Sequence, residues 1–322
     1  MAPIFAYIAH NDGVIDETAL ELLAAARKID AEAPVTAVVA GHGPGLHAAA
    51  GALATAYETV WKFSHEALAY PNAEALRPVL VSALPAGAIV LMIHDTFAMD
   101  LAPGLAVKRS AAYVSDVVDI RGMEDGTLGV VRQEFGGQVG SRVAVESAGG
   151  MVVTCRAGSF APAAPAIAGT VEDKSGEIGV VAAKRRFLER VVPEAGDVDI
   201  TKEEVLVAVG RGIEAEENID LAVELAKSMG AAVACSRPIV DARWLEHSRQ
   251  VGTSGQTVKP KVYLACGISG SFQHMGGIKG NPFIVAINKN PGAPIFQVAD
   301  VGIVADVLEF LPALTEAVQR AR

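Results

Sequence analysis

Two glycine-rich turns carry the residues of this chain whose types and spacing could do chemistry. Gly210-Arg211-Gly212 follows the apolar run Val205–Val209, and Gly267-Ile268-Ser269-Gly270-Ser271 follows Val262–Ala265. A glycine-rich turn between a strand and a helix can bind phosphate, because its backbone N–H groups point at the ligand near the positive end of the helix dipole. Both turns therefore predict a site for a phosphate-bearing cofactor, although a tight turn that needs glycine only for its backbone angles would look the same.

Polar side chains near the two turns are candidates for contacts with such a cofactor. Arg211 lies in the first turn and Ser269 in the second, while His274 follows soon after. Arg237 comes directly after another expected strand, Ala232–Cys235. Ligands of open α/β sheets lie across the carboxyl ends of the strands, so these residues are expected to converge. For His274, a helix cap or a surface position is an equally good explanation.

The first turn also comes close to the nicotinamide-dinucleotide fingerprint, because the pattern continues from Gly210 to Ala215. A nicotinamide enzyme usually places an acidic residue at the end of the next strand to bind the ribose. This chain has Ser236-Arg237 there. The sequence therefore disfavours an ordinary NAD site.

A third glycine-rich turn, Gly41 to Gly45, is better explained by the backbone geometry of a turn than by phosphate binding. Pro44 removes one of the N–H donors, and no basic residue nearby could neutralise a phosphate. Three histidines near this turn, His42, His47 and His65, lack metal-ligand spacing. The cysteines are far apart and predict small buried side chains rather than disulfides: Cys155, Cys235 and Cys266.

Positioning such turns requires parallel sheets, and the sequence predicts them. Short Val/Ile-rich runs alternate with Ala-rich helical patterns, which indicates an α/β fold of two domains, each with a mainly parallel sheet. The first half contains expected strands and helices as follows: strands Ile4–Ala9, Val35–Ala40 and Ala88–Ile93, and helices Thr18–Lys28 and His47–Tyr57. Between Ser110 and Thr170 an added pair of strands is expected near Gly129–Val131 and Met151–Thr154, for which antiparallel pairing is one arrangement.

A charged segment separates the two halves. Eleven of the twenty-one residues from Lys184 to Glu204 are charged, and Pro193 and Gly196 interrupt any periodic pattern, so we place the domains at 1–192 and 193–322. The second domain is expected to be doubly wound and Rossmann-like, with these elements: strands 205–209, 232–235, 262–265, 284–287 and 302–305, and helices 217–229, from 269 and 307–320.

Composition narrows the classes of partner. The chain has 322 residues and a net charge of −10, which disfavours contact with a nucleic-acid backbone. Its strongest apolar run, Ala88–Ile93, is far shorter than the roughly 20 residues of a bilayer-spanning helix, so no direct membrane insertion is expected. The first residues lack the basic region of a signal peptide, so the expected location is cytoplasmic.

The second half carries a resemblance to a known family. Val262-Tyr263-Leu264-Ala265-Cys266-Gly267-Ile268-Ser269-Gly270-Ser271-Phe272-Gln273-His274, continuing to Ala286-Ile287-Asn288, resembles the signature of the electron transfer flavoprotein alpha subunit. Further matching segments follow it: Lys289-Asn290-Pro291, Ala293-Pro294-Ile295-Phe296 and Ala299-Asp300. The first 190 residues are similar to the family in organisation, with Lys184-Arg185-Arg186 near the junction.

The resemblance implies an electron carrier rather than an enzyme with its own substrate. Such an alpha subunit forms a heterodimer with an electron transfer flavoprotein beta subunit and holds FAD in its C-terminal domain. It takes electrons from flavin dehydrogenases and delivers them to a quinone reductase or another acceptor. The N-terminal domain, 1–192, would then be structural and form the subunit interface. Whether the beta subunit holds FAD or AMP, and whether the system bifurcates electrons, is left open by the sequence.

The resemblance also implies roles for individual residues. Arg237 of the Ser236-Arg237 pair would lie against the isoalloxazine ring, and His274 would approach its pyrimidine end. The loop from Val251 to Gly255 resembles a Val-Gly-Gln-Thr-Gly loop whose hydroxyl approaches flavin N5. In this chain Thr253 stands in place of the Gln and Ser254 in place of the Thr, so a hydroxyl is retained.

The remaining roles concern the rest of the cofactor. Arg211 and the turn Ser269–Gln273 would lie along the ribityl chain and the phosphates, and the adenosine half would be flanked by Asn288, Asp306 and Val307. Phe272 replaces a usual Ile or Val. The full set of expected FAD-binding residues is Arg211, Ser236, Arg237, Val251, Gly252, Thr253, Ser254, Ser269, Gly270, Ser271, Phe272, Gln273, His274, Asn288, Asp306 and Val307.

Two other classes of function compete with the carrier. A self-contained flavin or nicotinamide oxidoreductase would need a substrate acid or base in the cleft, and His274 is the one evident candidate. A non-catalytic adenine-nucleotide-binding module would have the same parallel sheets. A flavin spectrum distinguishes the three functions. The carrier would be a yellow heterodimer, the oxidoreductase a yellow protein that turns over alone, and the adenine-nucleotide module a colourless protein.

Overall fold

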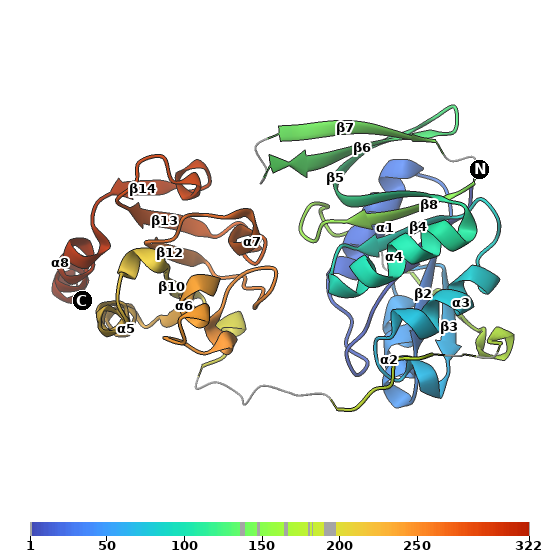
Figure 1. Cartoon of the computed structure of the whole chain (residues 1–322), viewed down its shortest axis with the longest axis horizontal. Coiled ribbons are helices and arrows are strands. Elements are labelled where there is room, and N and C mark those ends of the chain that lie inside the picture. The colour runs from blue at the N-terminus through green and yellow to red at the C-terminus, as the bar shows by residue number, and fades with distance from the viewer. Residues whose placement is uncertain are drawn as a thin grey trace. The chain divides into compact units, whose positions relative to one another are not determined.

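The chain folds into two compact units, Met1–Glu189 and Arg190–Arg322. This computed structural model describes residues 2–135, 139–146, 149–163, 167–179, 181, 183–189 and 198–321. The expected domain boundary between residues 192 and 193 lies outside the described residues. Each unit is built on its own sheet, and the α/β fold class is confirmed (Figure 1).

A nine-stranded sheet forms the centre of the first unit, in the order β7-β6-β5-β8-β4-β1-β2-β3-β9. Its neighbours pair in parallel, except that β6 is antiparallel to both β5 and β7. The strands are β1 (Ile4–Tyr7), β2 (Val35–Gly41), β3 (Thr59–Ser64), β4 (Ile89–Ile93), β5 (Ala112–Glu124), β6 (Thr127–Glu134), β7 (Val139–Glu146), β8 (Met151–Cys155) and β9 (Thr170–Asp173).

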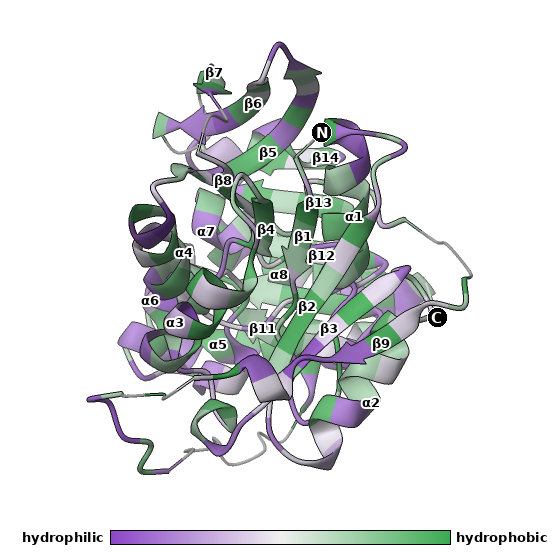
Figure 2. Ribbon diagram, turned by 90° about the vertical axis from the view of Figure 1, so that its right-hand side faces the viewer, coloured by the Kyte–Doolittle hydropathy of each residue, from purple (hydrophilic) through white to green (hydrophobic). Residues whose placement is uncertain are grey.

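Four helices cover the two faces of this sheet. They are α1 (Thr18–Ile29), α2 (Pro44–Leu53), α3 (Ala73–Ala83) and α4 (Thr96–Arg109). Side chains of a strand alternate between faces, so Ile4 and Ala6 of β1 join the core that includes α1 and α2, whereas Phe5 and Tyr7 join the core of α3 and α4. Figure 2 shows β1 and β4 largely in green, as this burial on both faces requires.

The added strands between Ser110 and Thr170 differ in part from expectation. Gly129–Val131 lies in β6, which is antiparallel to its neighbours, but Met151–Thr154 lies in β8, which pairs in parallel with both β4 and β5. The two segments are therefore not a pair, because β5 lies between them. β8 is completely buried and continues the central parallel sheet, which agrees with its mostly apolar sequence; its one polar side chain, Thr154, is hydrogen-bonded to His94.

The helices α3 and α4 were not among the elements expected from the sequence. Each contains an interior proline, Pro78 in α3 and Pro103 in α4. Proline removes one helical N–H donor and disfavours a helix interior, so these helices depend on packing for their stability. Proline also explains why α2 begins at Pro44 rather than at His47: a first helical turn needs no donor from its N1 residue.

The second unit contains a five-stranded parallel sheet in the order β11-β10-β12-β13-β14. Its helices α5 and α8 pack against each other along one face. The strands are β10 (Val205–Val209), β11 (Ala232–Cys235), β12 (Val262–Cys266), β13 (Phe283–Asn288) and β14 (Val301–Val304). The helices are α5 (Ile219–Met229), α6 (Arg237–Asp241), α7 (Phe272–Met275) and α8 (Val307–Ala321).

Within the described residues, no helix of either unit has both the length and the apolar character to cross a bilayer.

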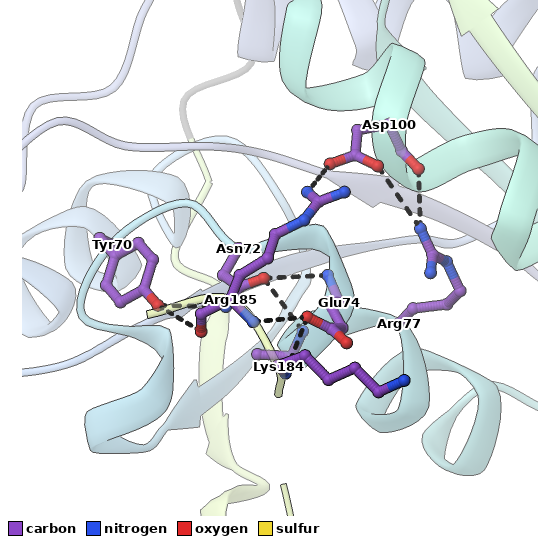
Figure 3. Close-up of polar contacts among 8 residues, drawn as sticks. Tyr70, Asn72, Glu74, Arg77, Asp100, Lys184 and Arg185 are labelled. Carbon is purple, nitrogen blue, oxygen red and sulfur yellow. Dashed lines mark hydrogen bonds and ion pairs between the residues drawn. The ribbon is translucent and has the colours of Figure 1, made fainter. Parts of the chain in front are cut away.

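Residues 183–189 are fastened to α3 and α4 at the end of the first unit, as Figure 3 shows. The Glu74 carboxylate accepts the backbone N–H groups of Lys184 and Arg185, both at 3.0 Å, and these bonds lower its pKa. The Arg185 guanidinium pairs with Asp100. The Tyr70 ring stacks on Phe187 at 4.7 Å between centroids, and its hydroxyl accepts the Phe187 N–H at 3.0 Å. Contacts of three kinds thus hold this segment in place.

We expect Tyr70→Phe to loosen this segment, because it removes the hydroxyl but keeps the ring that stacks on Phe187. The hydroxyl makes two hydrogen bonds to the segment, from the Phe187 N–H and to the Arg185 carbonyl. Their loss, about 1–2 kcal/mol, should speed tryptic cleavage after Lys184 or Arg185 about five- to thirtyfold. The rate is measured on the native chain by mass spectrometry. Tyr113→Phe, a half-exposed tyrosine of the same unit, is the control. Equal rates in the two variants would contradict the role of the Tyr70 hydroxyl.

Candidate functional site

The strand order of the second unit determines where its site lies. The chain runs from β10 outward to β11 in one direction, and from β12 to β13 and β14 in the other, so the order reverses between β10 and β12. Sheets of this order bind ligands at the carboxyl ends of the strands beside that reversal. Both glycine-rich turns of the sequence lie there, since Gly210 follows β10 and Gly267 follows β12.

The two turns are packed directly against each other. The Gly210 N–H donates to the Cys266 carbonyl at 2.9 Å, and the Gly212 N–H donates to the Gly267 carbonyl at 3.0 Å. A Cβ on Gly267 would come within 2.7 Å of the Gly212 Cα, and Gly267 has a φ of +66°. These glycines are therefore required for backbone contact between the turns.

This contact changes the interpretation of the first turn. The Gly212 N–H is already paired, and the next α-helix begins at Ile219, after two short 3-10 turns. The strand–turn–helix arrangement that the dinucleotide fingerprint requires is not formed by these residues. The second turn is also followed by less helix than expected, because α7 covers only Phe272–Met275 instead of beginning at Ser269.

A third segment, the loop Val251–Gly255, is held between β11 and α7. The Val251 N–H donates to the Cys235 carbonyl at 2.9 Å, and the Thr253 N–H donates to the Gln273 carbonyl at 2.8 Å. Gly252 has a φ of +146°, and a Cβ there would come within 2.9 Å of the Gln273 carbonyl oxygen. The loop is thus fixed at the same sheet edge as both turns.

Together these segments enclose a cavity of about 580 Å³, within the range of small-molecule and cofactor sites. Most of the residues expected from the sequence line it: Arg211, Ser236, Arg237, Val251, Gly252, Thr253, Ser254, Ser269, Ser271, Gln273 and His274. The convergence expected of Arg211, Arg237, Ser269 and His274 therefore occurs in the structure.

Five expected residues do not line the cavity: Gly270, Phe272, Asn288, Asp306 and Val307. Several of them have local structural roles. The Asn288 amide donates to the Ile268 carbonyl at 3.0 Å, and the Asp306 carboxylate accepts the Leu308 N–H at 2.9 Å at the start of α8. Val307 is buried in the core beneath α5 and α8.

Gly267 and Ile268 of the second predicted turn also line the cavity, whereas sequence reasoning missed Pro238, Asp241 and Gln250. Asp241 lies one helical turn after Arg237, and their side chains form an exposed ion pair at 3.4 Å. That spacing of four residues was a usable signal. Gln250 is buried, and its Nε2 donates to the Ser254 hydroxyl oxygen at 3.0 Å. Its position directly before the loop was the one hint in the sequence.

His274 is buried in the cavity wall, which excludes the surface position considered for it in the sequence. Its side chain is 5% exposed, and its Nε2 lies 2.8 Å from the Tyr263 hydroxyl. Its Nδ1 is buried and has no hydrogen-bond partner within the described part of the chain. Burial lowers the His274 pKa to about 4, although a backbone group of Val251 acts in the opposite direction. His274 is therefore neutral at physiological pH.

The charges and hydroxyls of the cavity suit an anionic cofactor with many oxygen atoms. Two arginines and one aspartate line it. Ser236 and Ser271 occupy the positions before α6 and α7, where serine usually caps the helix, but neither side chain makes a capping bond. An orphaned buried imidazole nitrogen, two cations and uncommitted hydroxyls fit a cofactor that carries phosphates and a polar ring.

Cys235 and Cys266 end β11 and β12, directly before the lining residues Ser236 and Gly267, and belong to the core that includes α5 and α8. Both are fully buried, and burial raises the pKa of each to about 12. Across the described residues, no group of three or more His, Cys, Asp or Glu side chains could hold a metal ion.

Comparison with known proteins covers both units. The family described as "Electron transfer flavoprotein domain" matches residues 4–185, and the "Electron transfer flavoprotein FAD-binding domain" matches residues 199–279. The chain belongs to the electron transfer flavoprotein family, as an alpha subunit. The resemblance seen in the sequence is confirmed, and FAD is the cofactor of the second unit.

Relatives of this flavoprotein include Protein FixB of Salmonella typhimurium, 40% identical over 240 residues that cover 73% of this chain and 74% of the relative. Protein FixB of Escherichia coli is 40% identical over 238 residues, covering 73% and 75%. Among solved structures, a protein described as a thiamin diphosphate-dependent enzyme from Mycobacterium smegmatis aligns with 97% of this chain. That alignment has a TM-score of 0.22 and 14% identity, and this chain spans 59% of that structure.

The buried His274 predicts a pH dependence of stability. Its pKa is about 4 in the folded chain and about 6.5 when unfolded, so between these values the unfolded chain binds a proton that the folded chain does not. The free energy of unfolding should therefore be highest above about pH 6.5 and fall by roughly 3 kcal/mol as the pH drops to about 4. His274→Gln should remove this part of the slope.

Urea unfolding of the flavin-free chain measures this, with Trp244 as the reporter of the second unit in a Trp61→Phe background. The exposed His247 is the other histidine of that unit, and His247→Gln serves as the control. If His274→Gln keeps the wild-type slope between pH 6.5 and 4, then His274 is not buried as a neutral side chain.

Proposed function

We propose that this chain is the FAD-carrying subunit of a heterodimeric electron carrier that takes electrons from flavin dehydrogenases and passes them to a quinone reductase or another acceptor. The observation that carries this proposal is the cavity at the β10–β12 reversal. It is lined by three segments of the family signature and offers cations and hydrogen-bond donors rather than an acid–base pair.

The proposed site follows the positions of the side chains. When bound, FAD supplies the reversible electron chemistry, and its reduction places negative charge near N1 and the C2 carbonyl of the ring. Arg237 would provide a cation beside that ring, and His274 a neutral donor at its pyrimidine end. Arg211 and the Ser269–Gln273 turn would bind the ribityl chain and the phosphates. The adenosine half would extend toward Asn288, Asp306 and Val307.

The Ser254 hydroxyl is prepared to donate a hydrogen bond. Its oxygen accepts from the Gln250 amide at 3.0 Å, so its own hydrogen is left for another acceptor. In the proposed complex that acceptor is flavin N5. The loop therefore keeps the hydroxyl function even though Thr253 and Ser254 replace the usual Gln and Thr. Thr253 uses its backbone N–H, rather than its side chain, to anchor the loop.

The first unit is proposed to be structural and to form the interface with the beta subunit. Cavities described in it have volumes of about 120 to 190 Å³, below the range of about 300 to 1,000 Å³ typical of cofactor sites. The proposal places the carrier in the cytoplasm, and it leaves the beta subunit's nucleotide and any electron bifurcation to that subunit.

The rival functions lack support from this cavity. An oxidoreductase acting alone needs a group that exchanges a proton with its substrate. Among the lining residues Asp241 is paired with Arg237, and His274 has its pKa lowered to about 4. A non-catalytic adenine-nucleotide module would have no use for the hydroxyl, cation and imidazole of the expected ring site.

We expect the chain expressed alone to lose flavin or to be poorly soluble, and co-expression with its beta partner to give about one FAD in this subunit. A partner that binds only the folded chain stabilises it by mass action. Size-exclusion chromatography with an absorption spectrum tests this. A monodisperse monomer with tight stoichiometric FAD would contradict the heterodimer, and substrate turnover by that monomer would favour the oxidoreductase.

Arg237→Ala in the reconstituted heterodimer should lower the first flavin reduction potential, because a cation is removed from beside a ring that gains negative charge. The Arg237 side chain is 69% exposed, so solvent screening limits the expected fall to some tens of millivolts. Arg237→Lys should recover part of it. Ser254→Ala should also change the potential, through loss of one hydrogen bond of about 1 kcal/mol.

Spectroelectrochemical titration gives these potentials. Arg320→Ala is the matched control, because Arg320 also forms an exposed ion pair with an acidic residue four positions away, but at the end of α8. If Arg237→Ala and Arg320→Ala have the same potential as the wild type, Arg237 does not lie near the ring.

A further inference from the structure

Tyr263 has its hydroxyl directed at the histidine of the cavity, although it does not line the cavity itself. It lies in the middle strand β12, its side chain is fully buried, and its hydroxyl is 2.8 Å from His274 Nε2. The two rings are tilted by 56°, with centroids 6.0 Å apart. For both residues, this is the one side-chain hydrogen bond found in the described part of the chain.

The possible arrangements of hydrogen atoms can be compared. A neutral imidazole has one nitrogen that donates and one that accepts, and a tyrosine hydroxyl has one hydrogen to donate. If Tyr263 donates to Nε2, the proton of His274 is on Nδ1, and that N–H is the one group left unpaired. If Nε2 donates to Tyr263 instead, both the hydroxyl hydrogen and the Nδ1 lone pair are left unpaired.

The first arrangement is favoured, because each unpaired buried polar group costs about 1–3 kcal/mol. The groups around the pair do not alter this result. Burial raises the pKa of Tyr263 well above its usual value, so the hydroxyl keeps its hydrogen. The neighbouring thiols of Cys235 and Cys266 are protonated, and sulfur is a weak acceptor. The Val251 backbone raises the His274 pKa, but it is not a hydrogen-bond partner of Nδ1, which has none within the described residues.

We propose that Tyr263 is a positioning residue that fixes His274 as the Nδ1–H tautomer and so makes it a hydrogen-bond donor to the electron-rich carbonyl edge of the flavin. This inference rests on the proposed function for the identity of the acceptor. The tautomer itself depends on the Tyr263–His274 contact alone. A hydroxyl buried in the sheet thereby acts on the cofactor through a second side chain.

Tyr263→Phe tests the proposal, because it removes the hydroxyl and keeps the ring in the core. The co-purified heterodimer carries ¹⁵N-labelled histidine and is studied with its flavin removed and then restored. Long-range ¹H–¹⁵N spectra distinguish a protonated from an unprotonated ring nitrogen. The wild type should show a single His274 tautomer with Nδ1 protonated, and Tyr263→Phe a mixture of the two.

The second readout is FAD binding, for which Tyr263→Phe should weaken the affinity about five- to tenfold, the effect of roughly one hydrogen bond. The matched control is Tyr57→Phe in the first unit. Tyr57 is equally buried, and its hydroxyl donates to the Ala19 carbonyl at 2.5 Å. This variant should lose stability without changing the His274 spectrum or the FAD affinity.

The outcomes separate the two proposals. A wild-type His274 protonated on Nε2, or a spectrum unchanged by Tyr263→Phe, would overturn the positioning role even if FAD binds as expected. Absence of FAD from the wild-type heterodimer would overturn the proposed function, while the spectra of the flavin-free protein would still decide the tautomer. An equal loss of FAD affinity in Tyr57→Phe would show a general effect of stability, which also overturns the positioning role.

Discussion

The backbone contact between the turns after β10 and β12 is the constraint on which the cofactor site depends. At the reversal of strand order, Gly212 and Gly267 approach so closely that neither could carry a side chain without displacing the other turn. The contact holds the end of β10 beside the end of β12. The loop Val251–Gly255 is hydrogen-bonded in turn to β11 and α7. The three segments that line the cavity are therefore all attached to the same edge of the sheet.

The strands of the second unit and the sheet edge with the cavity could be predicted from the sequence because both depend on local patterns, whereas β3, β5, β7 and β9 of the first unit were not expected. Short apolar runs indicated the strands β10, β11 and β12. Because ligands of open α/β sheets lie at the carboxyl ends of the strands, Arg211, Arg237 and His274 were then expected at one edge. The family motif extended the prediction to individual side chains. What could not be predicted depends on contacts between distant segments. The pairing of Gly212 N–H with the Gly267 carbonyl, which removes a donor from the first turn, has no trace in either local sequence.

Side-chain partners were missed for the same reason. Two hydrogen bonds, from Gln250 to Ser254 and between Tyr263 and His274, join residues whose contact no local sequence pattern indicates. From the sequence, Tyr263 is expected only to be a residue of an apolar strand. In the first unit, α3 and α4 form although each has an interior proline, Pro78 and Pro103 respectively. The apolar faces of α3 and α4 are buried against the sheet, and that burial outweighs the lost helical donors.

The buried thiols at the ends of β11 and β12 affect how well the protein withstands oxidation. Reduced flavins that meet oxygen generate peroxide, and peroxide attacks thiolates rather than thiols. With a pKa of about 12, the fraction of Cys235 or Cys266 present as thiolate at pH 7 is on the order of one in 10⁵. Sulfur atoms at the strand ends beside the proposed FAD site are therefore kept in a form that resists oxidative damage, and the sheet can carry cysteine where a small side chain is needed.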